Sequence, residues 1–338
     1  GISWTVVEAH RLMAKQLVDS FAPKLCVDIG CNDGTFLIEM KKLGVAVVGV
    51  EPTDVVDYAY RAGIPVLKRF FSERVAIDIG DKADLITMTN VFAHMAGLGQ
   101  VMRGVLALLS EDGVLVVENH YLLDVLEQGQ FDTIYHEHVR TYSLHALECL
   151  FEQYGMEVFY AARTPRYAGN IRVYVGRKGR HVVDASVALK RIAEVDAGLF
   201  SATTWGWWKA NVLRQRAMFM EWIYSMSRCG MKVAGCSAPG RASTLLNFYG
   251  VDKSLMSYTG ELSTSLKLDH FIPGCGIPIV DNKVFAVDQP DFIVLLAWHY
   301  RKEIAVRLRR EGIRSKFIAP LPSFSLFSVQ LEDIVQTC

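Results

Sequence analysis

Short apolar runs alternate with segments of helical spacing between residues 24 and 120. The runs are KLCVDIG (24–30), VAVVGVE (45–51), DLITMTNVFAHM (84–95) and DGVLVVENH (112–120). Uninterrupted apolar strands are typical of parallel sheets that carry helices on both faces. We therefore predict an α/β fold in which residues 20–120 form a doubly wound unit, preceded by a helix over 3–20.

A second series of apolar runs opens with MKVAGCSAPGRASTLLNFYG at Met231 and reaches PDFIVLLAW at 290–298. The chain has 338 residues, enough for two domains. The stretch between the two series contains no proline over 184–228, which predicts one or two long helices. The predicted organisation is a Rossmann-like domain at 1–120, a segment with strands that completes this domain at 121–183, a helical connection at 184–230 and a second Rossmann-like domain at 231–338, which would bind the acceptor.

Composition excludes several classes of partner. The 36 basic residues balance the 36 acidic residues, so the chain lacks the excess positive charge of a nucleic-acid binder. No apolar run reaches the roughly 18 residues that a membrane span needs. The 7 cysteines form no C-x-x-C pair, which favours reduced thiols in a cytoplasmic protein and gives no zinc site. The chain starts with Gly1, so we expect an excised or tagged fragment.

Residues 28–34 have the spacing D-x-G-x-x-x-G directly after an apolar run and before helical spacing. The glycines permit a tight turn and a close approach of a ligand to the backbone. Its two aspartates would repel a pyrophosphate but suit a ligand with a cationic amino-acid end. Glu51 ends the next run, where a carboxylate can bind both ribose hydroxyls. The segment resembles the cofactor turn of S-adenosyl-L-methionine (SAM) methyltransferases, and a glycine turn of another α/β protein is the alternative.

Two further positions extend the predicted cofactor site. Asn90 stands at the carboxyl end of its apolar run, where doubly wound folds bind ligands, and Val91–His94 would line the methionine side. Phe71 either stacks on an adenine or belongs to the core. The predicted cofactor-binding residues are therefore Asp28, Gly30, Asn32, Gly34, Glu51, Phe71 and Asn90.

The run Tyr135-His136-Glu137-His138 concentrates the residue types that transfer protons. If the segment is helical, Tyr135, His138 and Tyr142 share a face. A polar surface helix, or a histidine satisfied in the core, is the alternative interpretation. Metal binding is not expected, because H-E-H supplies few ligands and no complementary spacing lies nearby.

The stretch FDTIYHEHVRTYSLHALECLFEQYGMEV at 131–158 resembles the signature of nucleotide-sugar C-methyltransferases of the NDP-hexose 3-C-methyltransferase type, found in antibiotic deoxysugar pathways. In that family a SAM domain precedes the Y-H-E-H segment, an H-G-G-S-x-R turn and a second Rossmann-like domain. The second domain opens with a G-A-P-A-K-G-like turn and ends in a P-D-Y-x-L-x-L-x-W strand. Gly235–Asn247 and Pro290–Trp298 match these two features, and the resemblance covers roughly residues 20–320.

The resemblance implies a mechanism. A 4-keto group acidifies the neighbouring C–H bond, His138 removes the proton as general base, and the enolate carbon accepts the methyl group of SAM, which leaves S-adenosyl-L-homocysteine. Tyr135 and Glu137 match the supporting residues. The residues expected to bind the acceptor are His136, Tyr142, Tyr167, Asn170, Arg172, Arg241 and Lys267. The last three would make a local basic pocket for one pyrophosphate.

The sequence also departs from the family pattern. The family's N-terminal cysteine-rich zinc domain is not present, and the H-G-G-S-x-R turn reads Tyr167-Ala168-Gly169-Asn170-Ile171-Arg172. Gly240-Arg241 stands where Lys-Gly is usual, and Trp298-His299 replaces Trp-Asn. These changes fall where the family binds its sugar nucleotide, so we expect C-methylation with an altered acceptor pocket.

Four alternatives stay open at this point. The acceptor could be a carrier-bound β-keto acyl thioester, methylated by an excised synthase domain. His138 could instead deprotonate a hydroxyl, which would make the protein an oxygen or nitrogen methyltransferase. The chain could be a non-catalytic SAM-fold module that binds a partner protein. An NAD-dependent oxidoreductase using Gly235–Gly240 is disfavoured, because this turn lacks G-x-G-x-x-G and a clear acidic partner.

Overall fold

The computed structural model describes residues 4–329, so the predictions that extend over 1–3 and 330–338 lie in part outside the described residues. The chain divides into two compact units, and each is described by itself. The first unit comprises 1–122 and 137–197, and the second comprises 123–136 and 198–338. Over residues 4–329, no helix is long and apolar enough to cross a membrane.

The first unit contains a seven-stranded sheet with the order β3-β2-β1-β4-β5-β7-β6. Its five strands from β3 to β5 run parallel, and β7 runs antiparallel to both of its neighbours. The strands are β1 (Leu25–Ile29), β2 (Ala46–Val50), β3 (Val66–Leu67), β4 (Ala83–Thr89), β5 (Leu109–His120), β6 (Met156–Thr164) and β7 (Asn170–Arg177). The order reverses between β1 and β4, as in a doubly wound fold, which confirms the predicted α/β class.

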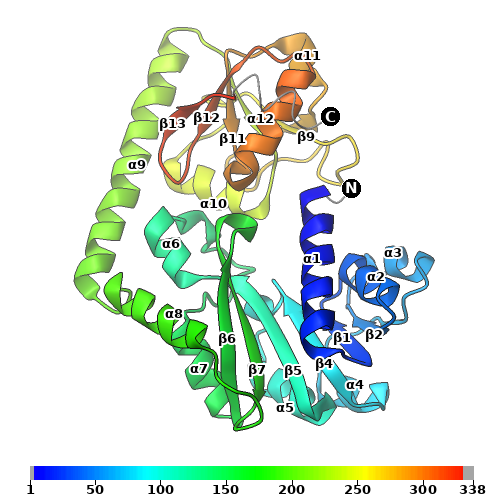
Figure 1. Ribbon diagram of the computed structural model, residues 1–338. Helices are drawn as coiled ribbons and strands as arrows, with labels where there is room; N and C mark the ends of the chain where they lie inside the picture. The colour runs from blue at the N-terminus through cyan, green and yellow to red at the C-terminus, as the bar shows by residue number, and fades with distance from the viewer. Residues whose placement is uncertain (1–3, 330–338) are drawn as a thin grey trace. The chain divides into compact units, whose positions relative to one another are not determined.

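Helices cover this sheet. α1 (Trp4–Phe21) lies along one face beside α2 (Thr35–Lys42), as Figure 1 shows, and both contribute buried side chains to one core cluster with the strands. α4 (Glu73–Ile79) and α5 (Leu98–Leu108) pack against one another. The other helices of this unit are α3 (Val56–Arg61), α7 (Leu144–Glu152) and α8 (Ala185–Asp196), with short 3-10 turns η1 (Phe92–His94) and η3 (Arg166–Ala168). The helix predicted over 3–20 is thus confirmed.

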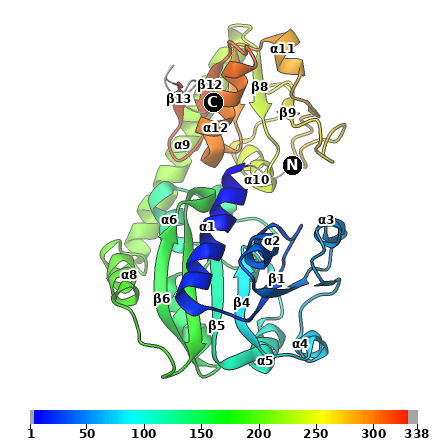
Figure 2. The same cartoon turned by 45° about the vertical axis from the view of Figure 1, so that its right-hand side comes forward.

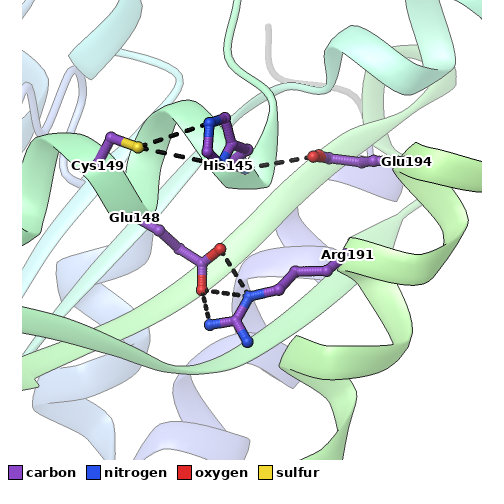
Figure 3. A network of polar contacts seen from close by, with 5 residues as sticks. All are labelled: His145, Glu148, Cys149, Arg191 and Glu194. Atoms are coloured by element: carbon purple, nitrogen blue, oxygen red, sulfur yellow. Dashed lines mark hydrogen bonds and ion pairs between the residues drawn. The ribbon is translucent and has the colours of Figure 1, made fainter. Parts of the chain in front are cut away.

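Polar contacts connect α8 with α7 within the first unit (Figure 3). Glu148 of α7 accepts hydrogen bonds from the Arg191 guanidinium of α8. Glu194 is buried and accepts from the backbone N–H groups of Leu144 and His145, at the start of α7. Because these donors have no partner inside the helix, the carboxylate caps α7 and complements its dipole. α7 begins at Leu144, directly after the segment that contains Tyr142.

The second unit is built on a six-stranded sheet with the order β10-β9-β8-β11-β12-β13. All its pairs are parallel except β12 with β13. α12 (Arg301–Arg310) lies over this sheet in Figure 2, and its apolar side chains share a core cluster with the strands. The strands are β8 (Val233–Cys236), β9 (Thr259–Glu261), β10 (Ile279–Asp281), β11 (Phe292–Leu295), β12 (Lys316–Ala319) and β13 (Ser325–Phe327).

Two further helices of this unit matter for the site. α9 (Ala202–Arg228) and α10 (Gly240–Tyr249) pack together through the rings of Phe219 and Tyr249, whose centroids are 5.1 Å apart. The remaining elements are α6 (Leu122–Gln128), η2 (Phe131–Thr133), α11 (Val284–Asp288) and η4 (Trp298–Tyr300). The predicted second Rossmann-like fold is confirmed, and the helical prediction for 184–228 corresponds to α8 and α9. The predicted domain boundaries stay predictions.

Candidate active site

The turn after β1 brings a buried carboxylate to the carboxyl edge of the first sheet. Asp28 is 5% exposed and accepts a hydrogen bond of 2.6 Å from the Thr87 hydroxyl of β4. Burial raises the pKa of Asp28 to about 7, the Thr87 hydrogen bond opposes this, and Glu51 adds to it. Gly30 has φ +75°, and a Cβ there would lie 2.6 Å from a methyl group of Val91. This position therefore requires glycine.

Glu51 holds the same turn from the end of β2. One carboxylate oxygen accepts from the backbone N–H of Asn32 at 3.2 Å, and the other accepts from the N–H and hydroxyl of Thr53. Asn32 has φ +53°, and Gly34 precedes α2 without a side-chain cap. The Thr35 N–H, the first of α2, donates to the Asp33 carboxylate at 3.2 Å, so the start of this helix lies beside carboxylates that suit the cationic end of a zwitterion.

A buried polar cluster lies at the ends of β4, β5 and β7. Glu118 accepts from the Arg172 Nε at 2.7 Å and from the Asn170 side-chain amide at 3.1 Å. The same amide donates to the Asn90 side-chain oxygen at 3.0 Å, and Asn90 adopts φ +56°. The structure therefore brings the predicted cofactor residue Asn90 together with the predicted acceptor residues Asn170 and Arg172.

Imidazole rings meet at the same edge. The His138 ring lies 4.7 Å from the His120 ring and 4.9 Å from the His94 ring, between centroids. His120 ends β5, and His94 lies in η1 directly after β4. Burial lowers the pKa of His94, while the Glu137 charge and a hydrogen bond to the Glu137 backbone oppose this. His94 thus contacts both residues of the Glu137-His138 pair.

The helical interpretation of the Y-H-E-H segment is wrong. Residues 135–142 form turns and an isolated bridge, and α7 begins only at Leu144. Ser143 caps that helix by accepting from the Ala146 N–H, which fixes the helix start after the segment. The segment is also split between the units, with Tyr135 and the exposed His136 in the second and Glu137 and His138 in the first.

The other predicted residues of the first unit occupy different settings. Tyr142 is 5% exposed and stacks on Phe92, and burial raises its pKa to about 12. Tyr167 has φ +53° in a turn where Ala168 also has positive φ, and its ring lies 6.0 Å from the His120 ring. Phe71 is buried against Gly104 of α5, which favours the core interpretation left open for it.

The three predicted basic residues are already engaged. Arg172 pairs with Glu118 in the first unit. In the second unit, Arg241 pairs with Asp132, and the Lys267 ammonium group donates to the Ala238 carbonyl at 2.7 Å. Both arginine charges are therefore neutralised by buried carboxylates, and the pyrophosphate pocket stays a prediction.

Orphaned polar atoms show that the edge of the first sheet suits a polar ligand. The side-chain nitrogens of Asn90 and Asn119, the Nδ1 of His10 and the Nε of Arg166 are buried without a hydrogen-bond partner among the described residues. Burial of such groups is costly unless a ligand or water satisfies them. Together with the raised pKa of Asp28, they fit the amino-acid and ribose groups of SAM. No group of three or more potential metal ligands gathers within residues 4–329.

Sequence reasoning missed His120, Glu118 and Arg166. His120 and Glu118 close the run DGVLVVENH, so the strand-end rule that singled out Asn90 applies to them as well. Arg166 stands directly before the Tyr167 turn, and its charge lowers the pKa of Asp28 and of His10. Nothing in the spacing of the sequence marks Arg166.

Comparison with known proteins agrees with this geometry. Residues 8–161 match the family described as methyltransferase domain, and residues 165–322 match the family described as C-methyltransferase C-terminal domain. The fold, the strand-end site and these matches define a SAM-dependent methyltransferase. Over 313 residues the chain is 32% identical to the C-methyltransferase NovU of Streptomyces niveus, an alignment that covers 90% of this chain and 74% of that protein. The chain belongs to this C-methyltransferase family.

More distant matches cover only part of the chain. A ubiquinone biosynthesis O-methyltransferase of Azorhizobium caulinodans is 27% identical over 96 residues, which is 27% of this chain and 38% of that protein. The magnesium protoporphyrin IX methyltransferase of Synechocystis PCC 6803 is 13% identical and covers 53% of this chain and 89% of that one, with a TM-score of 0.41. A structural match this distant does not bear on the substrate. Family membership sets aside the oxygen- or nitrogen-methylating, non-catalytic and NAD-dependent interpretations.

Proposed function

We propose that this C-methyltransferase deprotonates a carbon next to a ketone and methylates that carbon, with His138 as the general base. The observation that carries the proposal is the meeting of His138 with His94 and His120 at the strand ends. General-base help of this kind is worth roughly 10²–10⁴-fold. The C–H bond of the acceptor breaks, its proton passes to an imidazole nitrogen of His138, and the electron pair stays on the enolate.

The residues that would hold SAM surround the turn after β1. Asp28 would face the ammonium group, Glu51 the ribose hydroxyls, and Asn90 the methionine side. When bound, SAM supplies an electrophilic methyl group. Glu137 would orient the segment through its contact with His94, and Tyr135 would support the proton transfer.

The acceptor proposal rests on a likeness between the two units. In the second unit the Glu261 carboxylate, at the end of β9, accepts from the backbone N–H of Ala238 at 2.9 Å, as Glu51 accepts from Asn32 in the first. Glu261 is the acidic partner of the Gly235–Gly240 turn, which the sequence analysis did not find. An acid at this place can bind ribose hydroxyls. We therefore propose a keto-sugar nucleotide, or a related natural-product ketone, as acceptor, with its nucleoside on the second unit.

One observation favours a second candidate. Arg172 and Arg241, expected to neutralise a pyrophosphate, are paired with buried carboxylates. An acceptor without a pyrophosphate at this place, such as a carrier-bound β-keto acyl thioester, avoids that requirement. Incubation with both acceptor classes and SAM, followed by NMR of the product, distinguishes the two candidates and identifies the carbon that carries the new methyl group.

The catalytic assignment is tested with His138→Asn. We expect calorimetry to show unchanged SAM binding and turnover to fall by at least 10²-fold. His145→Asn is the matched control, because His145 is an exposed histidine of α7 and should not be needed. Normal turnover by His138→Asn would refute the mechanism, and weakened SAM binding would place His138 in the cofactor site instead.

A further inference from the structure

Between two stretches of the first unit, the chain has a short stretch in the second unit that includes the first half of the Y-H-E-H segment. It enters the second unit after Leu122 and returns at Glu137. The chain just before this stretch pairs with the chain after it inside the first unit. Tyr121 bridges to Tyr142, and the Leu122 N–H donates to the Tyr142 carbonyl at 2.9 Å. Contacts that hold residues 123–136 in the second unit therefore also hold Tyr135 and His136, the first two residues of the Y-H-E-H segment.

A buried ion pair fixes η2 in the second unit. Arg241 of α10 donates to both carboxylate oxygens of Asp132, each at 2.7 Å. The Trp298 indole N–H donates to the same carboxylate at 2.8 Å, and the guanidinium lies 4.8 Å from the centre of the Trp298 ring. Asp132 is fully buried, and the Arg241 side chain is 7% exposed.

A buried arginine–carboxylate pair fixes the orientation of its side chains more than it stabilises the fold. Burying two charges carries a large desolvation cost, and apolar replacements of similar volume are often equally stable. A bidentate arginine–carboxylate pair does fix the orientation of both side chains. Apolar packing is available independently, because the Phe131 ring lies 4.8 Å from that of Phe248 on α10. Stability alone thus gives no reason for an ion pair at this position.

The residue before Arg241 contacts the segment directly. A Cβ on Gly240 would lie 3.3 Å from the Tyr135 ring, so this ring packs on the backbone at the start of α10. Gly240 and Arg241 therefore hold two points of the same stretch, Tyr135 and Asp132.

We propose that Arg241 is a positioning residue for C-methylation: its ion pair with Asp132, with Gly240 beneath Tyr135, fixes the backbone of residues 132–135, from which the chain continues to His138. Arg241 acts through Asp132 and the backbone and does not neutralise a pyrophosphate. The inference rests on the proposed function, in which His138, six residues after Asp132, takes the proton. Misplacement of a reacting group by about 1 Å can cost 10²-fold in rate.

The decisive variant replaces the pair by apolar side chains, Asp132→Leu with Arg241→Met. We expect a folded protein with a Tm near that of the parent, unchanged SAM affinity by calorimetry, a nearly unchanged KM for the acceptor and a kcat lower by about 10–100-fold. A merely structural pair would not separate kcat from Tm and KM. Parental kcat in the folded double variant would overturn the proposal.

A second variant covers the case in which the double variant does not fold. Gly240→Ala leaves the ion pair intact but pushes the Tyr135 ring by a few tenths of an ångström, and φ at Gly240 is not in the left-handed region. We expect a kcat several-fold lower at unchanged Tm, and an unchanged kcat would overturn the proposal. Lys232→Met is the control, since it removes a half-exposed ion pair with Asp288 in the same unit and should change neither value.

His138→Asn distinguishes failure of this proposal from failure of the proposed function. An inactive His138→Asn beside a fully active Asp132→Leu/Arg241→Met overturns only the positioning role. An active His138→Asn overturns the proposed function, whatever the double variant does.

Discussion

The turn after the central strand is built in the same way in both units. In the first, the Gly30 N–H donates to the Val50 carbonyl at 2.7 Å, and Glu51 accepts from the Asn32 N–H. In the second, the Ser237 N–H donates to Gly260 at 2.7 Å, and Glu261 accepts from Ala238. Neither Gly34 before α2 nor Pro239 before α10 makes a side-chain cap, and the Thr35 N–H of α2 donates to Asp33 instead.

The two turns differ in charge. When Gly30 is matched with Ser237, Asp28 corresponds to Gly235, which packs against Thr259 and Leu296 and carries no side chain. The first turn thus offers a buried carboxylate of raised pKa. In the second turn the Lys267 ammonium group donates to the Ala238 carbonyl instead. One backbone arrangement therefore suits a cationic ligand in the first unit and an uncharged or anionic one in the second.

The largest expected effect concerns the ion pair that supports the first site. Arg172→Met leaves Glu118 as a fully buried carboxylate without its cation, and we expect a loss of about 3–5 kcal/mol in the free energy of unfolding. Urea unfolding followed by circular dichroism measures this loss. Arg180→Met, which removes an exposed pair of the same unit, should cost less than about 1 kcal/mol. Equal losses would mean that burial of Glu118 does not matter.

The second prediction distinguishes the roles of Glu51 and Glu261. Glu51→Ala removes a charged acceptor from the SAM turn, and a loss of about 1.5–3 kcal/mol raises the Kd for SAM roughly 10–150-fold. Glu261→Ala should raise the KM for the acceptor by a similar factor and leave the Kd for SAM unchanged. Calorimetry and initial rates on both variants test this. If Glu261→Ala weakens SAM binding instead, the comparison of the turns fails.

The third prediction uses the charge difference. The pKa of Asp28 in the free protein is raised to about 7, so the group is mostly protonated at pH 6. A bound ammonium group favours the carboxylate, so SAM binding should release most of one proton at pH 6 and much less at pH 8. Calorimetry in two buffers of different ionisation enthalpy counts the protons. Asp28→Asn should abolish the release, and persistence of the release would assign it to another group.

The last prediction compares one partly buried histidine in each unit. Burial lowers the pKa of His10 to about 4 and that of His299 to about 3, both from 6.5. The unfolded chain therefore takes up these protons first, and stability that is complete above pH 6.5 is lost as the pH falls toward the folded values. His10→Gln and His299→Gln should each flatten the pH dependence of Tm between pH 6.5 and 4. An unchanged slope in both would remove these histidines from the account.

The sequence predicts the parts of the site that local pattern determines. Apolar runs followed by glycines or acids predict the strands, and the strand-end rule places Asp28, Glu51 and Asn90 at one edge. Long-range pairing lies beyond this reasoning. Arg172 meets Glu118 across 54 positions and Arg241 meets Asp132 across 109, and no local signal marks which acid neutralises which arginine. The helical spacing of Tyr135, His138 and Tyr142 was misleading, because Ser143 starts the helix only after the segment.

The central claim is that His138 removes a proton from the carbon next to a ketone. It is tested most directly by incubating the enzyme with a ketone acceptor in D₂O without SAM and following deuterium incorporation by mass spectrometry. The account predicts that the parent protein and His145→Asn exchange this hydrogen and that His138→Asn does not. Exchange at the parental rate by His138→Asn would contradict it.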